Sequence, residues 1–194
     1  MENLIEQVKE YAIAFLTHHL PDNLHFHTVS HTIEAVEAAI EIGRQSNLTE
    51  EEMLTVETAA WFHDCGYTKK YIGHEQESKR IAAEFLEKLG CRNSFIETVL
   101  KCIDATRFPQ NPGSIEEKVL CDADLYHFAR INYPEYEKAI RLEFETCLGR
   151  YYTDQEWSAE NYHVLTHHHY HTDYGKKILT KFKKVNIQLI NERI

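Results

Sequence analysis

Two histidines and two aspartates of this 194-residue chain have the types and spacing that could hold a metal ion. His31 comes first, the adjacent pair His63-Asp64 follows, and Asp122 lies further along the chain. Imidazole and carboxylate groups together suit divalent Mn, Fe, Ni, Zn or Mg ions. The chain also carries 13 histidines, which favours metal chemistry without locating a site.

The His63-Asp64 pair places a condition on the local structure. Adjacent residues on an ideal helix point about 100° apart, so the two side chains can share an ion only near a helix end. Gly66 predicts such an end. Asp64 directly follows the apolar residues Ala59–Phe62, and a charge buried there is costly without a cation or hydrogen-bond partners.

Each of these residues also has an ordinary structural interpretation. His63 and Asp64 could cap a helix and face solvent. His31 could be a surface or core-edge histidine, and Asp122 a surface acid or the partner of a nearby base. The residues taken singly leave these alternatives open.

The elements that would position these side chains are helical, because apolar residues recur at helical spacing almost throughout. Ile33, Val36 and Ile40 predict a helix that stops at Gly43. Thr49 and Glu52 form a capping-box signature for a helix that should be buried at the centre of the fold. Further helices are predicted over 81–89, 95–103, 114–122, 134–144 and 172–185, with a loop at 108–113.

The helical periodicity, without a repeat, a low-complexity linker or a shift in composition, predicts one all-α domain over residues 1–194. The net charge of −10 argues against binding a nucleic-acid polymer, whereas a small phosphorylated substrate stays compatible with it. No stretch approaches the roughly 18 apolar residues of a membrane span, and residues 1–10 do not resemble a secretory signal. Five cysteines without a C-x-x-C pair indicate buried, reduced thiols. We therefore expect a cytoplasmic protein without a membrane partner.

The order His31, His63-Asp64, Asp122 resembles the H…HD…D pattern of the HD-domain metal-dependent phosphohydrolases, and specifically of small stand-alone HD proteins. The flanking segments extend the resemblance over about residues 25–150: SHTIEAV (30–36), AAWFHDCGY (59–67), Gly73-His74-Glu75 with Ser78, IDAT (103–106) and VLCDADL (119–125).

The resemblance implies a compact helical bundle that holds one divalent metal ion. His31, His63, Asp64 and Asp122 would be its ligands, and the ion would activate a water for attack on a phosphoester. HD-core phosphodiesterases carry a histidine four residues before the first ligand that protonates the leaving oxygen. Here that position is His27, which could face the same site if the helix already begins there.

Two departures from related patterns limit the resemblance. Thr106 stands where binuclear members carry a histidine, which puts a second metal in doubt, although His74 and Glu75 could be partial ligands. Cys65-Gly66-Tyr67 follows the His-Asp pair where guanosine-tetraphosphate hydrolases have a Glu-Asp dyad, which argues against that activity.

Cations for a substrate phosphate could come from Lys69, Arg107 or Arg141, among which Arg107 is the best placed. The histidine-rich run 166–171 could bind metal or line the substrate entrance, or could be a solvated connection before the last helix. Alternatives to the phosphohydrolase are a nucleotide-sensing HD module without turnover, an HD-core iron oxygenase and a plain helical scaffold.

Overall fold

The structure, a computed structural model, describes residues 2–194, and every regular element in that range is a helix. The helices in chain order are α1 (Glu2–His19), α2 (Val29–Gln45), α3 (Glu50–Phe62), α4 (His74–Lys88), α5 (Asn93–Ala105), α6 (Ile115–Asp124), α7 (Tyr133–Leu148), α8 (Asp154–His167) and α9 (Thr180–Asn191). Short helical turns are η1 (Cys65–Thr68), η2 (Tyr126–Ala129) and η3 (Gly175–Leu179). The predicted all-α fold is thus confirmed.

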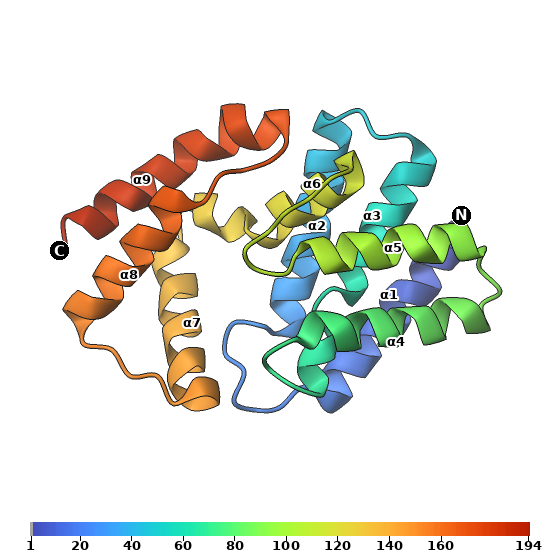
Figure 1. Cartoon of the computed structure of the whole chain (residues 1–194), viewed down its shortest axis with the longest axis horizontal. Helices are drawn as coiled ribbons and strands as arrows, with labels where there is room; N and C mark the ends of the chain where they lie inside the picture. The colour runs from blue at the N-terminus through green and yellow to red at the C-terminus, as the bar shows by residue number, and fades with distance from the viewer. Residues whose placement is uncertain (1) are drawn as a thin grey trace.

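The helices form two groups in space (Figure 1). Helices α1 to α6 surround the main hydrophobic core, and α7 to α9 lie together on the other side of the molecule. A smaller apolar cluster of Phe128, Tyr133, Leu165 and Ile190 joins η2 to the second group. The turn η2 therefore links the part of the fold that bears the motifs to the helices that follow them. The single-domain organisation stays a prediction.

Helix α3 is the buried central helix that the sequence predicts. It packs against α1, α2, α5 and α6, and its last five residues, Thr58–Phe62, are all buried. The predicted capping box is present, because the Thr49 hydroxyl accepts from the Glu52 N–H and the Glu52 carboxylate accepts from the Thr49 N–H. Position 63 is consequently fixed at the carboxyl end of a rigid, buried element.

Most predicted boundaries lie within a few residues of the observed ones, and the differences have local causes. Helix α2 continues past Gly43, where the missing side chain leaves room for Met53 of α3. Gly66 does not itself stop α3, which ends at Phe62. The last helix begins with the π-helical turn η3, and helices α1 and α8 lie outside the predicted ones.

Gly66 has a packing role. An added Cβ there would lie 1.9 Å from the carbonyl oxygen of His74, and the Gly66 N–H donates to the Ser78 hydroxyl at 2.8 Å. The glycine lets η1 lie directly against the start of α4.

No helix in residues 2–194 is long and apolar enough to cross a membrane.

We predict that Gly66→Ala lowers the free energy of unfolding by at least about 1–3 kcal/mol, the usual cost of overpacking. The backbone of His74 cannot move away as a flexible side chain would. Gly113→Ala is the matched control, because the atom nearest to an added Cβ there is a Glu117 carboxylate oxygen at 3.5 Å. Urea denaturation of both variants tests this, and equal stabilities would contradict it.

Candidate metal centre and adjoining pocket

Two imidazoles meet at the ends of α2 and α3. The Thr28 hydroxyl caps α2 by accepting from the His31 N–H, which places His31 in the first turn. His63 is the C-cap residue that directly follows α3, and its Nδ1 lies 2.7 Å from the Ala60 carbonyl oxygen. That carbonyl can only accept, so Nδ1 carries a proton and Nε2 is the nitrogen that could bind a cation.

Two carboxylates complete the cluster. The Asp64 Oδ2 atom lies 3.4 Å from His31 Nε2 and 3.2 Å from His63 Nε2. The Asp124 Oδ1 atom lies 3.4 Å and 3.6 Å from the same two nitrogens. Burial raises the pKa of Asp64, but the adjacent His63 outweighs it, and the pKa lies below its usual range.

The four imidazole–carboxylate separations, 3.2–3.6 Å, are close to those that a shared ion requires. Ligand atoms at about 2.1 Å from a metal, arranged tetrahedrally or at right angles, lie about 3.0–3.4 Å apart. His31 Nε2, His63 Nε2 and Asp64 Oδ2 are also buried without a hydrogen-bond partner. Buried polar atoms are rarely left unpaired, so their convergence indicates a site for a cation.

Asp122, the fourth ligand expected from the sequence, does not join the cluster, and Asp124 takes its place. The Asp122 carboxylate is fully buried and accepts three hydrogen bonds, from the His171 N–H at 2.7 Å, the Thr172 N–H at 2.9 Å and the Thr172 hydroxyl at 2.7 Å. Residues two positions apart in a helix point about 200° away from each other around its axis. The two aspartates therefore face opposite sides of α6. Asp122 thus fixes the segment that precedes the last helix.

One signal could have selected Asp124. His31 lies in the first turn of its helix, His63 and Asp64 follow the end of α3, and Asp124 is the last residue of α6. The convergence at a helix end that the His-Asp pair requires therefore applies to the fourth clustered side chain as well. The Asp-Ala-Asp run offers two equivalent candidates until the end of α6 is known.

His27 lies beside the cluster, in the segment before α2 and not within the helix. Its Nδ1 bonds to the Glu143 carboxylate of α7, and its Nε2 lies 3.0 Å from the Tyr67 hydroxyl. Burial lowers the pKa of His27, but the bond to Glu143 and the surrounding carboxylates outweigh it and raise the pKa. The protonated form of His27 is thereby favoured, with Nε2 directed toward the pocket residue Tyr67.

Glu143 itself is fully buried and had no role in the sequence-based site. Its Oε2 accepts from the N–H groups of His25, Phe26 and His27 at 3.0, 2.8 and 3.1 Å, and its Oε1 accepts from the Tyr71 hydroxyl at 2.9 Å. One carboxylate of α7 thus organises the whole segment that carries His27.

Two further histidines flank the cluster. His74 Nε2 lies 3.6 Å from Oδ1 of Asp64, the oxygen that faces away from His31 and His63, and the His74 ring stacks on Tyr67. Burial and then the neighbouring His31 lower the pKa of His127 to about 3, so this imidazole stays neutral. Thr106 is buried and donates to the Ile103 carbonyl at 2.9 Å.

A cavity of about 330 Å³ opens from the cluster toward α7 and α8. Asp64, Asp124, His27 and His74 line one part of it. Aromatic and aliphatic side chains from η2, α7 and α8 line much of the rest, together with polar residues that include Glu75, Glu137, Glu160 and Asn161. The cluster is therefore accessible to a small molecule from one side.

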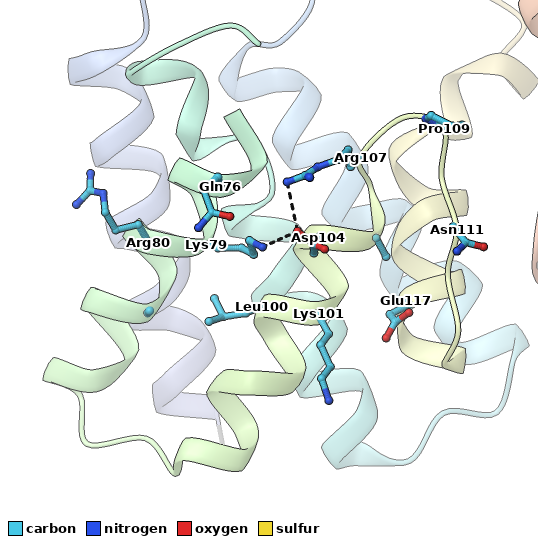
Figure 2. Close-up of a pocket in the computed structure, with 12 residues that line it drawn as sticks. Gln76, Lys79, Arg80, Leu100, Lys101, Asp104, Arg107, Pro109, Asn111 and Glu117 are labelled. Atoms are coloured by element: carbon cyan, nitrogen blue, oxygen red, sulfur yellow. Dashed lines mark hydrogen bonds and ion pairs between the residues drawn. The ribbon is translucent and has the colours of Figure 1, made fainter. Parts of the chain in front are cut away.

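The three cations predicted to bind substrate do not line this cavity. Lys69 is exposed, and Arg141 binds the Asp154 carboxylate and the Tyr152 carbonyl. Arg107 borders a separate surface depression between α4 and α5, where Figure 2 shows Lys79 and Arg107 both directed at Asp104. The positive charges around that depression are thus largely paired within the protein.

The histidine-rich run has structural contacts instead of a place at the cavity. His167 ends α8, and the His171 N–H binds Asp122. His168 is half-buried, and the Lys183 ammonium donates to its carbonyl oxygen. The run is therefore the connection between α8 and the last helix.

The HD domain family model matches residues 28–129, more than half of the chain, and this protein therefore belongs to the HD domain family. The match includes both histidines and both aspartates of the cluster. Among curated proteins, none matches the sequence.

Two solved structures have similar folds. A predicted HD superfamily hydrolase from an uncultured Thermotogales bacterium is 18% identical, with a TM-score of 0.65 over 94% of this chain and 89% of that chain. YpgQ from Bacillus subtilis, solved in complex with ADP, is 19% identical, with a TM-score of 0.64 over 98% of this chain and 97% of that chain. The likeness extends to the helices beyond the family match.

We predict that Asp122→Ala destabilises the fold by at least about 3 kcal/mol, because three donors lose their acceptor and each buried donor left unpaired costs about 1–3 kcal/mol. Thr172→Val should also destabilise, and the double variant should lose less than the sum of the two. Urea denaturation measures all three. Unchanged stability in Asp122→Ala would remove the anchoring role assigned to this carboxylate.

Proposed function

We propose that this protein is a metal-dependent phosphohydrolase that cleaves a phosphoester of a small molecule. One divalent ion, of Mn, Ni, Fe, Zn or Mg, would be held by His31, His63, Asp64 and Asp124. The observation that carries the proposal is the convergence of buried imidazole and carboxylate atoms that lack hydrogen-bond partners. A bound divalent ion supplies a Lewis acid that lowers the pKa of water and polarises a phosphoryl group.

Residues of the chain itself supply the remaining functions. The Ala60 carbonyl holds His63 in the tautomer whose Nε2 can bind a cation. Glu143 holds the proton on Nδ1 of His27, and a second proton on Nε2 would lie toward the Tyr67 hydroxyl at the cavity wall, where a leaving oxygen would take it in place of that hydroxyl. The Tyr67 ring stacks on the rings of both His27 and His74, which holds these side chains in place.

The nature of the ligand has support from a structural relative. YpgQ has this fold and was solved with ADP. A small phosphorylated molecule, either a nucleotide or another phosphomonoester, is accordingly the substrate class that we propose here. Turnover distinguishes this function from that of a sensing module with the same pocket.

We predict that wild-type protein binds one divalent ion per chain and that Asp124→Ala and His63→Ala weaken its affinity by at least about 100-fold. Saturation at a hundredfold excess over Kd stabilises by about 2.7 kcal/mol. At this chain length that corresponds to a fall in Tm of about 5–10 °C on chelation. Elemental analysis and thermal melts with and without chelator measure both quantities.

Asp122→Ala is the matched control, two residues from Asp124. It should melt at a lower temperature than wild type yet keep its response to chelator, whereas Asp124→Ala should lose the response. The opposite pattern would return the fourth ligand to Asp122. Full metal content in a His63→Ala, Asp124→Ala double variant would reject the site.

We predict that His27→Ala keeps its metal but cleaves alkyl phosphates about 10²–10⁴-fold more slowly, the usual contribution of general acid catalysis. Nitrophenyl phosphates need little protonation of the leaving group, so they should lose much less. His127→Ala is the matched control from the same cavity. Its neutral imidazole holds no acidic proton, so any loss should be equal for both esters. An equal loss in His27→Ala would exclude the acid role.

A further inference from the structure

The cavity beside the candidate metal centre has an apolar part distinct from its polar end. Residues of α7, α8 and η2 line this apolar part. The side chains of this part are aromatic or aliphatic: Phe128, Tyr133, Tyr136, Ile140, Phe144 and Trp157. Phe144 and Trp157 lie edge to face with ring centroids 6.0 Å apart. Aromatic rings arranged in this way favour contact with another flat ring.

Neither a lysine nor an arginine among residues 2–194 lines the cavity wall. The charged residues away from the candidate ligands are acids instead. Glu137 pairs with Arg193 at 2.7 Å, and Glu160 is exposed on α8. A phosphate beyond the first would therefore meet carboxylates in place of the cations that phosphate binding normally uses.

Two hydrogen-bond donors in the apolar part have no partner. Trp157 Nε1 and Asn161 Nδ2 are buried and unpaired, and their residues lie one helical turn apart on α8, both lining the cavity. The Tyr133 hydroxyl donates to Asn161 Oδ1 at 2.5 Å, which fixes the amide with its nitrogen free. Unpaired buried donors are costly, and a ligand acceptor would satisfy them.

From these three features we infer that the substrate is a monoester with a single phosphoryl group on a flat, apolar ring system that carries hydrogen-bond acceptors. Nucleoside di- and triphosphates and small polar esters are poor fits. This inference rests on the proposed phosphohydrolase function and specifies its substrate class. The ring lies between α7 and α8, and the phosphoryl group lies at the candidate metal centre.

Two series of probes test the inference. AMP, ADP and ATP share one ring and differ in phosphate number, whereas 1-naphthyl phosphate and glycerol 1-phosphate share one phosphate and differ in the ring. We expect kcat/KM for AMP to exceed that for ATP, and that for 1-naphthyl phosphate to exceed that for glycerol 1-phosphate, each by at least about tenfold. Calorimetry of adenosine with chelator-treated protein reports the ring site without turnover.

Variants of Trp157 locate the ring. Trp157→Ala should weaken adenosine binding at least about tenfold, whereas Tyr151→Ala, a change in an exposed side chain of the preceding loop, should not. If Trp157→Ala does not fold, Trp157→Phe serves instead. It keeps the apolar wall and loses only the N–H, so adenosine should bind more weakly while 1-naphthyl phosphate, which has no ring acceptor, keeps its kcat/KM.

The outcomes separate the two proposals. Equal or better cleavage of ATP, or equal cleavage of glycerol 1-phosphate, overturns the substrate class and leaves the phosphohydrolase function standing. If no ester is cleaved with any of the five metals, the phosphohydrolase function fails. Adenosine binding that depends on Trp157 would then still support the ring site, and its absence would overturn it.

Discussion

Two imidazoles and two carboxylates meet in the interior of this fold with three of their polar atoms buried and unpaired. Such an arrangement is costly unless a cation satisfies it. Its geometry depends on the ends of three helices: the Thr28 cap sets α2, the fully packed α3 sets the His-Asp pair, and the end of α6 sets Asp124. The packing of the main core thus places the start of α2 and the ends of α3 and α6 close together, so that their side chains meet.

Two further carboxylates, those of Glu143 and Asp122, connect this centre to the rest of the chain. Glu143 of α7 binds the backbone and the imidazole of the segment before α2, across 116 residues of sequence. Asp122 binds the segment that leads into the last helix. Both contacts tie the C-terminal helices to the motif-bearing ones. The cavity between the two groups therefore has a polar end formed by His27, Asp64, His74 and Asp124, and a largely apolar wall from η2, α7 and α8.

The polar end and the apolar wall of the cavity come from different stretches of the sequence. The family match covers residues 28–129, whereas most of the apolar wall comes from residues beyond it. The clustered imidazoles and carboxylates and most of the apolar wall thus lie in different parts of the chain. Cations predicted from the motif-bearing part, such as Arg107, are engaged in surface ion pairs instead.

The sequence by itself determined the helical class, the capping box at Thr49, the buried central helix and three of the four clustered side chains, because periodicity, caps and the His-Asp pair are properties of contiguous residues. Only the tertiary structure decided between Asp122 and Asp124, because that choice depends on where α6 ends and which of its faces meets α2. The tertiary structure also revealed the role of Glu143 and the cavity wall that lacks lysine and arginine. Both arise from helices distant in sequence, whose approach no local pattern encodes.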